Sequence, residues 1–219
     1  MEPFATIGDL PDVIPVFPLS GAILLPRAVL PLNIFEPRYL AMTRDAMAGD
    51  RVIGIVQPKG DERSGPPELF ATGGLGRITR FSETGDGRFL IALTGLIRFR
   101  IESELQVATP YRQVRADYAP FVHDWDPAPP LPAAARAGLE ESLRAYLDTQ
   151  NLTADWEAVR GADDEGLVST LASVCPFEIL ERQALLEAPD LAARSDMLAA
   201  LMRFAGSVGG GASAPGTLQ

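Results

Sequence analysis

A carboxylate, a guanidinium and a phenol lie within four residues of one another in the stretch PLNIFEPRYLAM, residues 31–42. Glu36, Arg38 and Tyr39 are side chains that can hold or transfer protons, so a catalytic or binding site is one interpretation. The start of a helix is the other. With Glu36 at the N-cap, Pro37 takes the first helical position, where its missing N–H costs nothing.

The helical interpretation also explains the apolar neighbours of this stretch. Phe35 and Leu40 stand at the two positions of a hydrophobic staple, which fixes the angle at which the chain enters a helix. If Phe35 is buried in this way, Phe35→Ala should destabilise the protein by roughly 3–5 kcal/mol. The pattern therefore favours a structural role for the segment Phe35, Glu36, Pro37, Arg38 and Tyr39.

Other residues that could do chemistry stand alone in the sequence. His123 is the single histidine, and no G-x-S-x-G turn accompanies it, so a Ser-His-Asp set is not indicated. Cys175 is the single cysteine, which excludes an internal disulfide and a zinc site built on cysteines. The run GGLG at 73–76 is not followed by the lysine of a phosphate-binding loop. We expect no catalytic residue, cofactor or metal.

Arginines of the first half are the remaining candidates for binding. Arg98 and Arg100 alternate with apolar residues and should share one face of a strand. They could form a basic patch for an acidic peptide or a phosphate backbone, or simply a solvated face with local ion pairs. As candidate peptide-binding residues we take Arg98, Arg100, Phe121 and Trp125.

The elements that must position these residues fall into two halves. The 219 residues allow one large domain or two small ones, and the composition is that of a globular protein. Residues 1–122 read as β-rich, with apolar runs at 13–17, 28–35, 51–58, 74–83, 88–95, 96–103 and 111–118. Asp86-Gly87 predicts a hairpin turn, and one helix is expected near 37–48. A compact, partly closed β structure fits better than a parallel sheet.

Residues 123–206 follow a proline-rich joint and read as helical. Leu139 and Leu143 lie on one face of a helix within 131–150, and Asp163 or Asp164 can cap the next one. Pro176 suits the first turn of a helix, and Asp190 can cap a last helix that ends near Gly206. Residues 207–219 are expected to be a disordered tail. The fold class is α+β.

Net charge is −10 and is uneven along the chain. Residues 1–120 carry net −1, whereas residues 121–219 carry net −9. The acidic half should repel nucleic acid, so nucleic acid is an improbable partner. No apolar stretch is free of prolines and charges for long enough to cross a membrane, and we expect a cytoplasmic protein.

Three segments together resemble the Lon-type N-terminal substrate-binding domain. They are IPVFPLSGAILLPRAVLPLNIFEPRYLAM, GGLGRITRF with the following GRFLIALTGLIRFRI, and QALLEAPDLAARSDMLAALM, and the similarity extends over about residues 12–205. The resemblance implies a PUA-like β domain followed by a helical bundle. Lon proteases continue into an ATPase module and a Ser-Lys protease domain, and neither follows here. The chain resembles stand-alone bacterial forms of this domain.

The resemblance implies a non-catalytic module that binds unfolded or exposed polypeptide segments. It would act as a substrate-recognition unit or adaptor, in partnership with a separate protease or chaperone. A Pro-rich joint between two lobes is compatible with a binding cleft. The alternative is an RNA-associated role, because PUA-like folds elsewhere bind RNA, and the arginines of the β half are its support.

Overall fold

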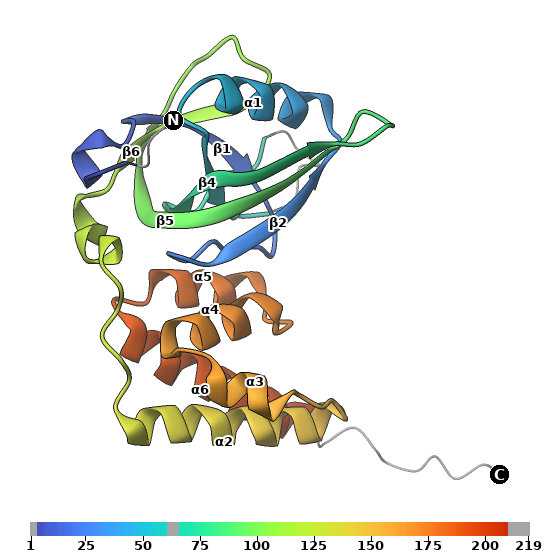
Figure 1. Ribbon diagram of the computed structural model, residues 1–219, viewed down its shortest axis with the longest axis vertical. Helices are drawn as coiled ribbons and strands as arrows, with labels where there is room; N and C mark the ends of the chain where they lie inside the picture. The colour runs from blue at the N-terminus through green and yellow to red at the C-terminus, as the bar shows by residue number, and fades with distance from the viewer. Residues whose placement is uncertain (1–3, 61–65, 210–219) are drawn as a thin grey trace, which may run out of the picture. The chain divides into compact units, whose positions relative to one another are not determined.

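The computed structural model describes residues 4–60 and 66–209, which form two compact units. Of the described residues, those within 1–127 and 178–187 form the first unit, and those within 128–177 and 188–219 form the second. Figure 1 labels most of the strands and helices that are named below. The elements of the first unit are η1 (Ile7–Asp9), β1 (Val13–Pro18), β2 (Val29–Ile34), α1 (Pro37–Ala48), β3 (Val52–Val56), β4 (Thr72–Glu83), β5 (Phe89–Glu104), β6 (Arg112–Asp117), η3 (Ala119–Trp125) and α5 (Ile179–Glu187).

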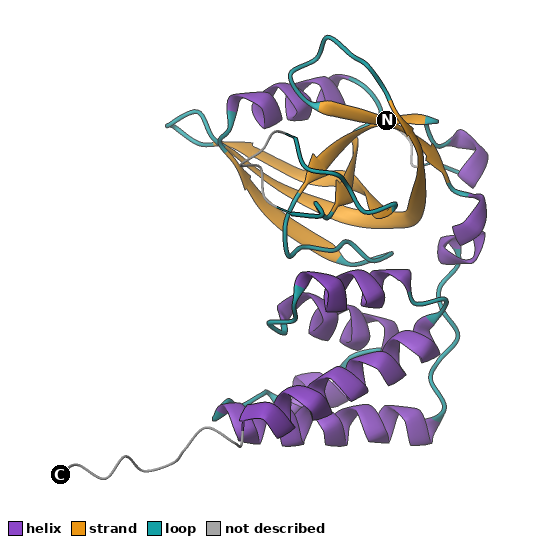
Figure 2. Ribbon diagram, turned by 180° about the vertical axis from the view of Figure 1, so that it is seen from behind, coloured by secondary structure: helices purple, strands orange, loops and turns teal. Residues whose placement is uncertain are grey.

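The second unit is helical, and Figure 2 shows every strand in the first unit. Its helices are α2 (Ala133–Gln150), α3 (Trp156–Gly161), α4 (Asp164–Val174) and α6 (Leu191–Gly209). A mixed α+β fold with a sheet followed by helices was predicted, and it is confirmed.

The strands close into a barrel with one additional strand at its edge. The sheet order is β2-β5-β4-β3-β1-β6, and β5 also pairs with β6, which closes the ring. All pairs are antiparallel except β1 with β3. β2 pairs with the first half of β5, from Val29 opposite Thr94 to Ile34 opposite Phe89. β2 is therefore the edge strand of an otherwise closed sheet.

β5 is one strand of 16 residues, whereas two strands were expected over 88–95 and 96–103. The prediction was wrong because Gly95 does not end the strand but bends it. The register with β4 shifts between Leu75 and Gly76, opposite Ile97 and Gly95. A Cβ on Gly95 would lie 2.0 Å from the carbonyl oxygen of Leu25. Glycine is required here because another backbone segment crosses the strand at this point.

Helix α1 begins as expected, with Glu36 at the N-cap and Pro37 in the first turn. The Glu36 side chain makes no cap hydrogen bond and instead pairs with Arg38, with 3.0 Å between Oε2 and Nε. Tyr39 is buried, and its ring centroid is 4.0 Å from that of Phe17. The residue that departs from expectation is Phe35, which is 60% exposed. The staple therefore does not bury it, and a cost of roughly 3–5 kcal/mol for Phe35→Ala no longer follows.

We call the first unit the barrel unit and the second the helical unit. Helix α5 belongs to the barrel unit, although its neighbours in the sequence are helices of the helical unit. The Gln183 amide donates to the backbone oxygen of Thr72 at 3.2 Å, and Gln57 donates to Gln183 Oε1 at 3.0 Å. Arg98 Nη1 donates to the backbone oxygen of Leu186 at 2.9 Å. The structure thus divides the chain differently from the expected single boundary after residue 122.

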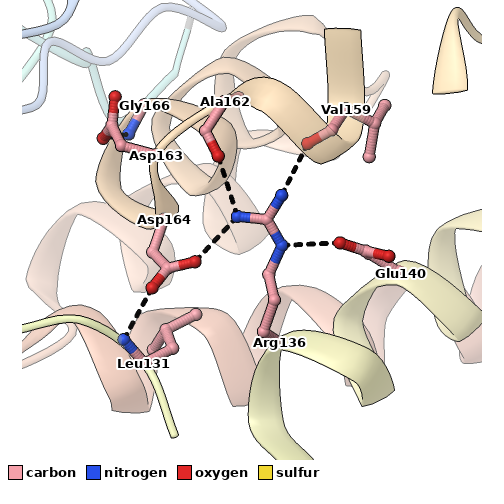
Figure 3. Close-up of polar contacts among 8 residues, drawn as sticks. All are labelled: Leu131, Arg136, Glu140, Val159, Ala162, Asp163, Asp164 and Gly166. Carbon is pink, nitrogen blue, oxygen red and sulfur yellow. Dashed lines mark hydrogen bonds and ion pairs between the residues drawn. The ribbon is translucent and has the colours of Figure 1, made fainter. Parts of the chain in front are cut away.

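In the helical unit, Arg136 connects three helices (Figure 3). Its Nε donates to Glu140 Oε1 on the same helix, and its Nη1 donates to Asp164 Oδ1, each at 2.7 Å. The same guanidinium also bonds the backbone oxygens of Val159 and Ala162. Those carbonyls lie in α3 and directly after it, where the last turn of a helix leaves its acceptors unpaired. Arg136 therefore joins α2 to the ends of α3 and α4.

The helix ends of the helical unit agree in part with those predicted from the sequence. Asp163 Oδ1 accepts from the Gly166 N–H at 2.8 Å, and Asp190 Oδ1 accepts from the Ala193 N–H at 2.8 Å, as predicted. Pro176 lies before a helix that begins at Ile179, so its predicted place in the first turn was wrong. The expected tail at 207–219 begins as the last turn of α6, and residues 210–219 lie outside the described residues.

Candidate functional site

The outward face of β2 and β5 carries an exposed apolar stripe. Side chains alternate along a strand, so residues 29, 31, 33 and 35 share one face of β2 and its continuation. Val29 is 63% exposed and Phe35 is 60% exposed. Across the ladder, Leu90 lies opposite Asn33 and is 47% exposed. We call Val29, Pro31, Phe35 and Leu90 the β2–β5 face; Ala92, which lies opposite Pro31, is buried.

Buried side chains on the opposite side of the β2–β5 strand pair fix the position of this face. Ile34, Phe89, Ile91 and Leu93 alternate with the exposed residues, point to the other side of the sheet and are buried in one core cluster. That cluster also includes Met42 from α1. The buried side chains fix the register of the strand pair, because a slip by one residue would expose them all. The exposed stripe is thus presented on a rigid support.

The rim of the face carries charged side chains. Arg88 lies beside Phe35, with its guanidinium carbon 5.8 Å from the ring centroid, and Arg80 lies opposite Ala92 on β4. Asp86 pairs with Arg88 at 3.0 Å. The hydrogen bond from Thr84 lowers the pKa of Asp86, so this carboxylate is ionised at neutral pH. An apolar stripe with charges only at its edge is typical of surfaces that bind other chains.

The free edge of β2 is not suited to pairing with another strand. The Gly95 N–H donates to the Ala28 carbonyl oxygen at 2.8 Å, so Ala28 and Gly95 are a hydrogen-bonded pair. Every second residue of β2 from Ala28 onward then directs its backbone groups towards β5. The backbone groups of Val29, Pro31 and Asn33 then point away from β5. Pro31 has no N–H to offer there, which interrupts the edge at its centre. Binding at this place therefore uses the side chains of the face rather than an added strand.

The candidate residues taken from the sequence are not brought together on a surface. Arg98 is 3% exposed, so it cannot be a peptide-binding residue of an open face, and that prediction was wrong. Its Nε and Nη2 donate to the two carboxylate oxygens of Asp124 at 2.7 Å and 2.8 Å. Phe121 covers the same guanidinium at 4.7 Å, and both Phe121 and Trp125 are half-buried against the core. Arg100 is exposed and remains an untested candidate.

The residues of the opening motif line a small pocket in the same unit. It has a volume of about 240 Å³, and Arg38, Tyr39, Tyr111 and Arg112 are among its walls. Each arginine is already paired, Arg38 with Glu36 and Arg112 with Glu104. Burial, aided by the hydrogen bond to Asp45, raises the pKa of Tyr111 to about 12, so the phenol stays protonated near neutral pH. We see a structural cluster here and no acid–base pair.

The described residues gather no metal-binding set. His123 is exposed in η3, and Cys175 is buried and forms no disulfide. Within residues 4–60 and 66–209, no three His, Cys, Asp or Glu side chains are grouped so that they could hold a metal ion. No helix in this part of the chain is both long and apolar enough to cross a membrane.

The β2–β5 face was missed because its sequence looks buried. AVLPLNIF and RFLIALTG are nearly continuous apolar runs, which are typical of strands covered on both faces. The exposure of Val29 and Leu90 follows from the edge position of β2, and that position depends on pairing with residues about 60 places further along the chain. Pro31 is the one local signal, because proline within a strand favours an edge.

Comparison with known proteins gives a consistent result over most of the chain. A family model described as the ATP-dependent protease La (LON) substrate-binding domain matches residues 13–203. Lon protease 2 of Myxococcus xanthus is 30% identical over 200 residues, which are 89% of this chain and 24% of that protein. Lon protease 2 of Sorangium cellulosum is 28% identical over 202 residues, 87% of this chain and 24% of that one. The chain thus spans about a quarter of the length of these curated relatives.

Solved structures agree with the observed fold. The crystal structure of a Lon N-terminal domain protein from Xanthomonas campestris has a TM-score of 0.60 and 24% identity, and covers 86% of this chain and 97% of that one. The N-terminal domain of a Mycobacterium avium complex Lon protease has a TM-score of 0.61 and 19% identity, and covers 87% and 97%. At these identities the likeness establishes the fold.

Proposed function

Because the chain belongs to the ATP-dependent protease La (LON) substrate-binding domain family, we propose that it binds polypeptide segments without acting on them chemically. Family membership supports a substrate-binding module. The proposal adds that the substrate is an unfolded or exposed stretch of polypeptide and that the β2–β5 face receives it. The observation that carries this addition is the exposure of Val29, Phe35 and Leu90 on one face of an edge strand pair.

The physics of the β2–β5 face suits a partner of variable sequence. Burial of apolar surface is non-directional and contributes about 25 cal/mol per Å² removed from water. A face that offers Val29, Pro31, Phe35 and Leu90 can therefore accept many apolar side chains, provided that the partner is extended enough to expose them. A folded protein hides such side chains, so discrimination between folded and unfolded partners follows from the same property.

In this proposed role, a separate protein module carries out any cleavage of the bound polypeptide. The sequence contains one lysine, Lys59, and no phosphate-binding loop of the Walker type. The similar proteins from Myxococcus xanthus and Sorangium cellulosum are proteases of about four times this length. In the proposal, segments bound here are passed to a protease or chaperone module, and this chain selects them.

Binding of a permanently unfolded protein tests the proposal. Reduced and carboxymethylated α-lactalbumin, labelled with a fluorophore, would be titrated with the wild type, with Phe35→Ser/Leu90→Ser and with the matched control Phe204→Ser. Phe204 is 65% exposed, close to the value for Phe35, but it lies on α6. We expect the double variant to weaken binding about tenfold, or about 1.4 kcal/mol, and the control to leave it unchanged. Equal affinities for all three proteins would contradict the proposal.

A further inference from the structure

The helical unit contains five arginines, and three of them hold the unit together. Arg136 joins α2 to α3 and α4 through the contacts of Figure 3. Arg194 is buried and donates to the backbone oxygen of Ala188 at 3.3 Å. Arg203 on α6 donates to Ser142 Oγ on α2 at 2.9 Å. The remaining two, Arg144 and Arg160, make none of these contacts.

Arg144 and Arg160 line the same pocket. The pocket has a volume of about 380 Å³ and lies where the end of α2 meets α3. The guanidinium of Arg144 lies over the ring of Trp156, with 4.5 Å from its carbon to the ring centroid. Leu147 and Leu152 add apolar walls, and Leu152 is 55% exposed. Two cations and an accessible apolar surface therefore meet within one concave region.

The positive charge of this pocket is only partly compensated. In the described part of the unit, neither Arg144 nor Arg160 has a carboxylate within ion-pair distance. One carboxylate, Asp148, does line the pocket, so two positive charges meet one negative charge there. The surrounding sequence is strongly acidic, with net −9 over residues 121–219. A local excess of positive charge in such a unit attracts an anionic group of limited size.

We propose that this pocket binds a polypeptide segment in which an Asp or Glu lies next to an apolar residue. The carboxylate would accept charge-assisted hydrogen bonds from Arg144 and Arg160, which are about twice as strong as neutral ones. The apolar neighbour would pack on Trp156 and Leu152. A nucleic acid strand fits less well, because its successive phosphates would extend beyond the pocket onto acidic surface. The pocket is separate from the β2–β5 face, and neither proposal depends on the other.

The test uses short peptides blocked at both ends, so that only side chains carry charge. A labelled ten-residue peptide containing Leu-Asp-Glu-Leu would be compared by fluorescence anisotropy with its Leu-Asn-Gln-Leu counterpart. We expect the full chain to bind the acidic peptide at least about tenfold more tightly, because charge-assisted bonds contribute most of the difference. Arg144→Gln/Arg160→Gln should remove this preference, and Arg144→Lys/Arg160→Lys should keep part of it.

A charge-matched control separates a site from a general effect of net charge. Arg44→Gln/Arg115→Gln removes two exposed arginines of the barrel unit that lie outside the β2–β5 face and its rim, and it should leave the preference intact. In a Trp125→Phe background, the acidic peptide should also change the fluorescence of Trp156. Equal binding of the two peptides, or full binding by Arg144→Gln/Arg160→Gln with a native circular dichroism spectrum, would overturn the proposal. Tighter binding of a ten-residue oligothymidylate would overturn it in favour of nucleic acid.

Discussion

Replacement of Asp124 by alanine is expected to destabilise the barrel unit by about 3–5 kcal/mol, the usual cost of leaving a buried charge without its partner. Arg98 is 3% exposed, so water cannot replace the lost carboxylate. The variant loses three hydrogen bonds, from Nε, Nη2 and the backbone N–H of Arg98 to the Asp124 carboxylate, at 2.7, 2.8 and 3.1 Å. The guanidinium keeps the Leu186 carbonyl as an acceptor, but a carbonyl carries no compensating charge.

Urea unfolding, followed by circular dichroism and by tryptophan fluorescence, measures this effect. A matched control is Glu104→Ala, which breaks the pair with Arg112 on a carboxylate that is 44% exposed, and it should cost no more than about 1 kcal/mol. Arg98→Met/Asp124→Ala should recover part of the loss, because it removes the uncompensated charge. A loss below about 1 kcal/mol for Asp124→Ala, or no recovery in the double variant, would refute the electrostatic reasoning.

Four further substitutions test the surroundings of single residues. Gly74→Ala should destabilise by about 3 kcal/mol or more, because its Cβ would lie 1.9 Å from the Leu24 carbonyl oxygen; Gly138→Ala, with nothing within 4 Å, should stabilise by roughly 0.5–1 kcal/mol in urea unfolding. The Tyr111 pKa is raised from 10.0 to about 12, so its stabilising contribution is complete below pH 10 and is lost as the pH rises towards 12. Tyr111→Phe should reduce this alkaline loss, and an unchanged pH profile would count against it. Phe35→Ser should change the free energy of unfolding by less than about 0.5 kcal/mol, because the ring is 60% exposed. A loss above about 2 kcal/mol would contradict this and favour a Phe35 side chain buried in the staple with Leu40.

Local signals in the sequence predicted the local structure well. The capping aspartates Asp163 and Asp190 act on backbone groups three residues ahead, so their role is readable from a few letters. The same holds for Pro37 at the start of α1 and for the Asp86-Gly87 turn between β4 and β5. Each of these features depends on backbone groups that are close in the chain.

Features that depend on distant residues were not predictable in this way. Arg98 looked solvent-exposed because it alternates with apolar residues, yet its partner Asp124 is 26 residues away and approaches from η3. Helix α5 looked like a member of the helical unit, yet Gln183 bonds Thr72, which is 111 residues earlier. Phe35 stood at a staple position that would bury it, yet it follows a strand at the edge of the sheet and is 60% exposed. In each case tertiary pairing decided the environment of the side chain.

The most direct measurement of the central claim is to locate where an unfolded polypeptide touches the chain. A photoreactive p-benzoylphenylalanine would replace Phe35 on the β2–β5 face and, in a second variant, Phe204 on α6, two aromatic positions of similar exposure. After irradiation with reduced and carboxymethylated α-lactalbumin, we predict strong crosslinking from position 35 and weak crosslinking from position 204. Equal yields from both positions, or crosslinking from position 204 alone, would contradict the assignment of polypeptide binding to this face.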